Sequence, residues 1–268
     1  MISDEKYLKL INYLKDLKKV LVAFSGGVDS TFLLKAAKDA LKDKVKAVII
    51  VSPYMAKWEI KDARELADEL NVDCEIIRIP IIDTIKRNPK NRCYLCKKFI
   101  FSKIREIAKN QGYDYIVDGT NFDDTNDYRP GIKALKELNI KSPLFEVNLT
   151  KEDVRILSKK LGLKTWNKPS YACLLTRLPY GEEFKIEDFE KIEKAEKYMM
   201  DIGFKAVRVR CHKNLARIEV NREDRKKLFD EKLLDKIVKE LKEYGFQYIT
   251  LDMEGYRVGS FNQMISSE

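Results

Sequence analysis

The stretch "VLVAFSGGVDSTFLLKAAKDAL", residues 20–41, decides the fold of this chain. It begins with an apolar run typical of a buried strand and ends with apolar residues at helical spacing. Between the two lies the turn "SGGVDS", residues 25–30. A strand, a glycine turn and a helix in this order are typical of a βαβ unit, so the stretch predicts a parallel sheet.

The turn itself has the features of an anion-binding loop. Gly26 and Gly27 let the backbone approach an anion closely, and the helix that begins near Ser30 directs its free N–H groups toward the same point. Neither the Walker A spacing nor the G-x-G-x-x-G fingerprint is present. From the glycines alone, a simple connection between strand and helix is an equal alternative to a phosphate site.

Further apolar runs at residues 44–52, 73–80 and 113–120 alternate with helical patterns. This alternation predicts an α/β fold, a doubly wound parallel sheet with helices on both faces. Ligands of such sheets bind beyond the carboxyl ends of the strands. Several residues that follow strands should therefore converge with the turn, namely Ser52, Asp118, Gly119, Thr120 and Asn121.

The pattern changes near residue 169. A helical pattern covers residues 185–204, alternating strands cover 206–212 and 216–220, a second helical pattern covers 222–245, and a last strand follows at 246–252. We therefore expect a first domain over residues 1–168 and a smaller C-terminal α+β domain over residues 169–268.

The composition favours an anionic ligand. The chain has 52 basic and 43 acidic residues, a net charge of +9, and the surplus is spread along the sequence. Nucleotides satisfy such a surplus as well as nucleic acids do. No apolar run approaches the length of a membrane span and the N-terminus is not of the signal-peptide type, so we expect a cytoplasmic protein without a membrane partner.

Three of the five cysteines form a distinctive set. Cys93 and Cys96 make a C-x-x-C pair at the start of a predicted helix, and Cys173 lies in the segment between the predicted domains. Three thiolates from one crevice suit a [4Fe–4S] cluster with one open iron. A redox or persulfide pair, half of a zinc site and purely structural cysteines are the alternatives. Cys74 is expected to be a buried inert thiol, and Cys211 and His212 to be structural or substrate-facing.

The string "SGGVDS" resembles the PP-loop of the ATP pyrophosphatases, an adenine nucleotide α-hydrolase-like fold. This resemblance implies that ATP is split into AMP and pyrophosphate while a substrate oxygen is adenylated. It implies pyrophosphate contacts from Ser25, Gly26, Gly27 and Ser30. Asp29 would lie near a Mg²⁺ ion. The segment 118–131 could supply Asp118, Thr120 and Asn121 to the nucleotide and Asp124 to the metal.

The chain resembles the LarE family over nearly its whole length. The resemblance is carried by the PP-loop and by the segments 88–97 ("NPKNRCYLCK"), 142–181 and 208–212 ("RVRCH"). The resemblance implies an ATP-dependent sulfur transferase of nickel-pincer nucleotide biosynthesis. Its small-molecule substrate would be pyridinium-3,5-biscarboxylic acid mononucleotide, of which one carboxylate is adenylated and converted to a thiocarboxylate. The resemblance also implies a homo-oligomer and leaves the source of sulfide open.

The resemblance assigns the catalytic sulfur chemistry to the cysteines. Cys173 matches the sulfur-bearing cysteine of the family, which in single-cysteine members surrenders its sulfur and becomes dehydroalanine. Cys93 and Cys96 make this chain resemble the three-cysteine members, which are thought to hold a [4Fe–4S] cluster. The sulfur would then come from the cluster, and the sacrificial route from Cys173 is the alternative.

Three arginines are candidates for substrate binding. Arg208 and Arg210 alternate with valines, so their side chains share one face of a strand and could clamp a phosphate. The alternative is a solvated charged face. Arg177 and its neighbour Thr176 follow Cys173 closely and are further candidates for the same pocket.

Other functions of the same motifs stay open at this point. A tRNA thiolation enzyme would combine a PP-loop with C-x-x-C and a distant cysteine, but the sequence has no recognisable RNA-binding module, so we expect no nucleic-acid partner. An amide-forming synthetase that uses ammonia would have incidental cysteines. A nucleotide-sensing module would bind ATP without turnover.

Overall fold

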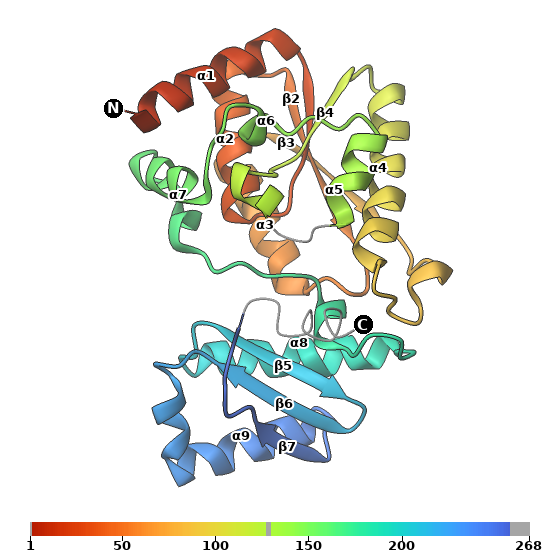
Figure 1. The fold of residues 1–268 in the computed structure, drawn as a ribbon, viewed down its shortest axis with the longest axis vertical. Coiled ribbons are helices and arrows are strands. Elements are labelled where there is room, and N and C mark those ends of the chain that lie inside the picture. The colour runs from red at the N-terminus through yellow and green to blue at the C-terminus, as the bar shows by residue number, and fades with distance from the viewer. Residues whose placement is uncertain (1, 127–129, 258–268) are drawn as a thin grey trace. The chain divides into compact units, whose positions relative to one another are not determined.

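The computed structural model describes residues 2–126 and 130–257, and the chain divides into two compact units. The first unit contains residues 1–52, 57–82 and 91–171. The second contains residues 53–56, 83–90 and 172–268. Each unit has its own sheet and its own helices (Figure 1).

The first unit is built on a four-stranded parallel sheet. Its strands are β1 (Val20–Ala23), β2 (Val45–Val51), β3 (Asp73–Arg78) and β4 (Tyr115–Val117), in the order β3-β2-β1-β4. Every neighbouring pair is parallel. The predicted parallel sheet is therefore confirmed.

Helices cover both faces of this sheet, as a doubly wound fold requires (Figure 1). Successive residues of β1 divide between the two cores, because side chains alternate along a strand. Val20 and Val22 pack with one helix layer, whereas Leu21 packs with the other. The first layer contains α1 (Ile2–Leu17), α2 (Val28–Leu41), α3 (Lys57–Glu69), α6 (Pro143–Glu146) and α7 (Lys151–Lys160), and the second contains α4 (Arg92–Asn110) and α5 (Pro130–Glu137).

The strand order fixes where a ligand can bind. The chain leaves β1 toward β2 and β3 and then returns to place β4 on the opposite side of β1. The carboxyl ends of β1 and β4 therefore flank a topological switch point, where ligands of open α/β sheets bind. The "SGGVDS" turn follows β1, and residues 118–121 follow β4.

The second unit is a smaller α+β structure. Its mixed sheet contains β5 (Val207–His212), β6 (Leu215–Val220) and β7 (Tyr248–Leu251). The β5–β6 pair is antiparallel and the β6–β7 pair is parallel. The helices α8 (Ile186–Asp201) and α9 (Glu231–Glu243) accompany this sheet. The predicted smaller α+β region is confirmed.

The prediction of a single helix over residues 222–245 is wrong for residues 222–230. The structure has a 3₁₀ helix η5 (Arg225–Phe229), followed by α9 from Glu231 onward. Asp230 separates the two because its carboxylate accepts a hydrogen bond from Leu233 N at 3.2 Å. An aspartate in this role caps a new helix rather than continuing the previous one.

Two short segments distant in sequence belong to the second unit. Tyr54 O accepts a hydrogen bond from Leu174 N at 2.8 Å, and Asn88 O accepts one from Gly181 N at 3.2 Å. The segment 83–90 includes the 3₁₀ helix η1 (Asp83–Ile85). The predicted division after residue 168 assigned both segments to the first domain. Among the described residues, no helix is long and apolar enough to cross a membrane.

Candidate active site

Gly26 gives the turn after β1 a conformation that other residues cannot easily adopt. Its φ of +69° lies in the left-handed region, and a Cβ at this position would lie 2.7 Å from Ala63 Cβ in α3. The turn is therefore pressed against α3, which only a residue without a side chain permits.

Serine hydroxyls hold the turn in shape. The Oγ atoms of Ser25 and Ser30 lie 3.0 Å apart, and Ser30 Oγ donates to Gly27 O at 3.2 Å. Gly27 is the N-cap of α2 and provides no side-chain cap. The first N–H groups of a helix lack intrahelical partners, so this helix terminus is suited to bind an anion.

The end of β4 lies directly against this turn. A Cβ on Gly119 would lie 2.9 Å from Ser30 N, so the two backbones approach too closely for any larger residue. Asn121 Nδ2 donates to Asp29 Oδ1 at 3.2 Å. The structure therefore brings together the residues predicted to follow β1 and β4.

Asp118 connects this edge of the sheet to the C-x-x-C helix. The buried Asp118 carboxylate accepts hydrogen bonds from Thr120 Oγ1 and Ser142 Oγ, each at 2.6 Å. Lys97 Nζ lies 4.0 Å from Asp118 Oδ2. Because Lys97 follows Cys96 in α4, the amino-terminal end of this helix lies near the same edge as the turn.

Ser52, at the end of β2, has an unsatisfied hydroxyl. Its side chain is buried, and its Oγ has no hydrogen-bond partner among the described residues. Buried hydroxyls are normally satisfied by protein, water or a ligand. Ser52 therefore fits the predicted nucleotide-contact set.

The two aspartates predicted for Mg²⁺ have protein partners. Asp29 accepts hydrogen bonds from Asn121 and Lys151, and Asp124 Oδ2 accepts one from Asn121 N at 3.0 Å. No group of three or more metal-ligating side chains occurs within residues 2–126 and 130–257. One or two carboxylates together with substrate phosphates are the usual Mg²⁺ ligands, so Asp29 fits such a site without a dedicated protein cage.

Two lysines at the turn were missed by the sequence reasoning. Lys151 Nζ donates to Asp29 Oδ2 from the first turn of α7, and Lys168 Nζ donates to Gly26 O at 3.3 Å and to Asp62 Oδ2 at 3.2 Å. Both bring positive charge to the loop. Both lysines lie in the segment 142–181 that carries the family resemblance, but no local pattern singles out either of them.

None of the five cysteines, all of which the structure describes, is in a disulfide, and they differ in environment. Cys93 is exposed and Cys96 half-buried in the first turns of α4, while the half-buried Cys173 precedes the 3₁₀ helix η4 (Leu174–Arg177) of the second unit. Burial raises the pKa of the Cys74 thiol to about 11 and that of Cys211 to about 12. Those last two are therefore protonated at neutral pH and suited to structural roles.

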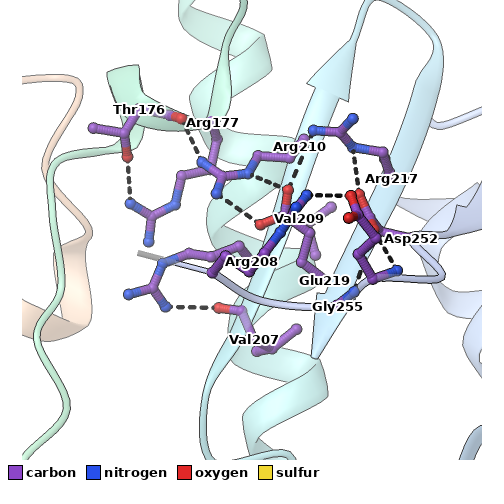
Figure 2. A network of polar contacts seen from close by, with 12 residues as sticks. Thr176, Arg177, Val207, Arg208, Val209, Arg210, Arg217, Glu219, Asp252 and Gly255 are labelled. Carbon is purple, nitrogen blue, oxygen red and sulfur yellow. Dashed lines mark hydrogen bonds and ion pairs between the residues drawn. The ribbon is translucent and has the colours of Figure 1, made fainter. Parts of the chain in front are cut away.

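The candidate arginines of the second unit are buried. Each donates hydrogen bonds to neighbouring residues (Figure 2). Arg177 pairs with Glu196 through two hydrogen bonds of 2.9 Å. Arg210 pairs with Glu219 through bonds of 2.9 and 2.7 Å, and its Nη1 donates to Thr176 O at 2.6 Å.

Arg208 has a different environment from the other two arginines. It donates from Nη1 to Val207 O at 2.7 Å, and its Cζ lies 4.8 Å from the centre of the Tyr256 ring. With exposures of only 4% for Arg208 and 5% for Arg210, the alternative of a solvated strand face is wrong. Their role toward a substrate stays a prediction.

The fold and the turn define a class, the PP-loop ATP pyrophosphatases. The NAD synthase family matches residues 5–123, which include the turn and β4. Among similar proteins is the pyridinium-3,5-bisthiocarboxylic acid mononucleotide synthase of Lactiplantibacillus plantarum, 38% identical over 97% of this chain and 95% of that protein. The chain belongs to the LarE family of sulfur transferases.

Two uncharacterized proteins are similar over almost the same length. One, from a Synechocystis strain, is 38% identical over 98% of this chain and 99% of its own length. The other, from Methanocaldococcus jannaschii, is 37% identical over 96% of this chain and 99% of its own length. Both units of the structure therefore belong to the shared sequence.

Proposed function

We propose that this protein uses ATP to adenylate a carboxylate of pyridinium-3,5-biscarboxylic acid mononucleotide and converts it to a thiocarboxylate. The observation that carries this proposal is the 38% identity over 97% of the chain to a synthase of the bisthiocarboxylic acid mononucleotide. The PP-loop geometry supports the ATP-dependent half of the reaction.

The first step is adenylation. A substrate carboxylate oxygen attacks the α-phosphorus of ATP, and pyrophosphate leaves. The N-terminus of α2 and the hydroxyls of Ser25 and Ser30 would hold the pyrophosphate. Asp29 would bind Mg²⁺, and Lys151 would neutralise charge that develops on the leaving group.

The second step is sulfur transfer. A sulfur nucleophile attacks the acyl carbon, the C–O bond to the phosphate breaks, and AMP leaves with the original carboxylate oxygen. If Cys173 itself is the nucleophile, cleavage of its Cβ–Sγ bond with loss of a Cα proton leaves dehydroalanine. A carboxylate needs this activation because it is otherwise a poor electrophile.

The finer proposal is that Cys93, Cys96 and Cys173 hold a [4Fe–4S] cluster. It is supported by the donor chemistry of three incompletely buried cysteines that form no disulfide, two of which lie one turn apart on α4. When bound, such a cluster would supply sulfide at the iron that three thiolates leave open.

The second unit would bind the substrate. We propose that Arg208, Arg210 and Arg177 surround its phosphate. This is supported by the bonds of Arg177 and Arg210 to the stretch that carries Cys173, and by the place of Arg208 beside Arg210 on β5. We also propose that the protein is cytoplasmic and forms a homo-oligomer, as the family resemblance implies.

The experiment measures pyrophosphate and AMP release together with the mass of the substrate after incubation with ATP and Mg²⁺. The expected result is one pyrophosphate per carboxylate oxygen replaced by sulfur. Pyrophosphate release without sulfur incorporation, or incorporation that does not require ATP, would contradict the proposed function.

The source of sulfur is tested with cysteine variants after anaerobic reconstitution with iron and sulfide. Cys93→Ala should lose most of the iron, and the control Cys74→Ala should keep it, because the Cys74 thiol is protonated and half-buried in β3. If wild type binds no iron and dehydroalanine forms at residue 173 during turnover, the sacrificial route replaces the cluster.

A further inference from the structure

The backbone around Cys173 is held by side chains of its own stretch and of two other parts of the second unit, the segment 83–90 and β5. In the stretch 172–179, the carbonyl oxygens of most residues accept side-chain hydrogen bonds. The donors are Asn88, Thr176, Arg177 and Arg210, and the accepting carbonyls are those of Ala172, Cys173, Leu175, Thr176, Leu178 and Pro179.

Asn88 makes the largest share of these bonds. Its Nδ2 donates to Pro179 O at 2.8 Å, to Leu178 O at 2.9 Å and to Leu175 O at 3.3 Å. Its side chain is fully buried, with an exposure of 0%. Its Oδ1 has no hydrogen-bond partner within the described part of the chain, so the amide is oriented by the three carbonyls alone.

The backbone of Asn88 is also specialised. Its φ of +46° lies in the left-handed region, which asparagine tolerates better than most residues. Its own carbonyl accepts a hydrogen bond from Gly181 N at 3.2 Å. Asn88 therefore fastens the stretch 175–181 through both its side chain and its backbone.

The opposite end of the stretch is fastened by Arg177. Its Nη1 donates to Ala172 O at 2.6 Å and to Cys173 O at 3.3 Å, while Nε and Nη2 bind Glu196. Glu196 Oε1 also accepts a hydrogen bond from Val209 N at 2.9 Å, and Val209 lies between Arg208 and Arg210 (Figure 2). The Cys173 backbone is thereby tied to β5.

We propose that Asn88 is a positioning residue for Cys173, which fixes the turn that presents its sulfur. This inference rests on the proposed role of Cys173 in sulfur transfer. Asn88 contacts no reacting atom. It holds three carbonyls that follow Cys173, while Arg177, paired with Glu196, holds the carbonyls of Ala172 and Cys173. A reacting group held in one geometry avoids the entropy cost of ordering during the reaction.

The test uses Asn88→Asp in the full chain. Aspartate has the same shape and tolerates the left-handed backbone, but its carboxylate cannot donate to the three carbonyls and is repelled by them. Asn71→Asp is the matched control, because Asn71 is exposed and has a φ of +52°.

The first readout is the rate of alkylation of each cysteine by iodoacetamide, measured by mass spectrometry on reduced, chelator-treated protein. Cys211 is 1% exposed in the same unit and reports unfolding, while the exposed Cys93 reports reagent activity. We expect Cys173 to react at least about fivefold faster in Asn88→Asp, with Cys211 and Cys93 unchanged.

The second readout is thiocarboxylate formation. We expect kcat to fall about tenfold or more with an unchanged KM for ATP, because the residues at the PP-loop belong to the other unit. Unchanged Cys173 alkylation and kcat would overturn the positioning role. Faster alkylation of Cys211 in both Asn88→Asp and the milder Asn88→Gly would also overturn it, by showing that Asn88 only stabilises the unit.

The proposed function fails separately from this inference. If Cys173→Ala forms thiocarboxylate as fast as wild type, Cys173 has no role in the reaction, whatever Asn88 does to its alkylation. If Cys173→Ala is inactive and Asn88→Asp behaves like wild type, only the positioning role is lost.

Discussion

Lys151 donates a hydrogen bond from its Nζ to Asp29 Oδ2, across 122 residues of sequence. The other oxygen of Asp29 accepts a hydrogen bond from Asn121 Nδ2 at 3.2 Å. The carboxylate proposed to bind Mg²⁺ is therefore already paired with a cation at the PP-loop. A metal ion and a lysine ammonium would compete for this carboxylate, and phosphate oxygens could attract the displaced ammonium.

We predict that Lys151→Ala slows adenylation while it strengthens Mg²⁺ binding. Removing one donor that stabilises developing charge costs about 100-fold to 1,000-fold in rate, whereas loss of the competing ammonium favours the metal. The measurement is the rate of pyrophosphate release as a function of Mg²⁺ concentration. A wild-type maximal rate in Lys151→Ala would contradict this role.

Lys160→Ala is the control for this prediction. Lys160 lies on the same helix and pairs with Asp4 at 3.0 Å, but both side chains are more than half exposed. Exposed pairs contribute about 0–1 kcal/mol, so this variant should keep the wild-type rate and metal dependence.

Gly119→Ala should weaken ATP binding without removing any side-chain donor. Its new methyl group would lie 2.9 Å from Ser30 N and 3.2 Å from the Asp29 carbonyl carbon, both of them backbone atoms. The PP-loop must shift to relieve this overlap, which we expect to raise the Kd for ATP at least about tenfold. Isothermal titration calorimetry measures the change, and an unchanged Kd would mean that the loop adapts without cost.

The sequence predicted the parts of this structure that depend on neighbouring residues. The apolar runs and the Gly26-Gly27 turn predicted β1, the PP-loop and α2, because strand, turn and helix each have a local pattern. The rule that ligands bind beyond the carboxyl ends of parallel strands predicted the convergence of Asp29 with Asn121.

The contacts between distant segments could not be predicted in this way. No sequence pattern links Lys151 to Asp29. Nor does any local pattern indicate that Asn88 donates hydrogen bonds to three carbonyls about 90 residues further along the chain. From the sequence, the strand segment "RVR" was as compatible with a solvent-exposed face as with a phosphate-binding one. Its charges can be buried because Glu196 of α8 and Glu219 of β6 bond to this strand.

Glu219→Ala should destabilise the second unit strongly. Glu219 is 1% exposed and accepts two hydrogen bonds from Arg210 and one from Arg217. Leaving the Arg210 charge buried without its partner costs about 3–5 kcal/mol. Urea unfolding followed by circular dichroism measures the free energy of unfolding, and a loss below about 1 kcal/mol would contradict this prediction.

The double variant Arg210→Met/Glu219→Leu separates the structural role of Arg210 from its proposed role toward substrate. Replacing both charges of a buried pair by apolar residues often restores stability, so we expect most of the lost free energy to return. If Arg210 also binds the substrate phosphate, the KM for the substrate nucleotide should rise in this stable variant. A wild-type KM would assign Arg210 to structure alone.

Cys211 gives the second unit a specific dependence on high pH. Burial raises the pKa of its thiol from 9.0 to about 12, and its Sγ donates to Lys213 O at 3.3 Å. The folded protein therefore keeps this proton where the unfolded chain has lost it. The stabilising contribution is present below pH 9 and is lost as the pH rises from 9 toward 12, by up to about 1.4 kcal/mol per pH unit.

Cys211→Ala is the variant that isolates this dependence, because alanine has no proton to lose. Alanine lowers stability at every pH because packing is lost. The comparison is therefore between the slopes of the free energy of unfolding against pH, and not between its absolute values. We expect the free energy of unfolding of Cys211→Ala, measured in urea between pH 8 and pH 11, to fall less steeply than that of wild type. Equal slopes would mean that the Cys211 thiol ionises in the folded protein as readily as in the unfolded chain, and that the lysines and tyrosines alone cause the alkaline loss of stability.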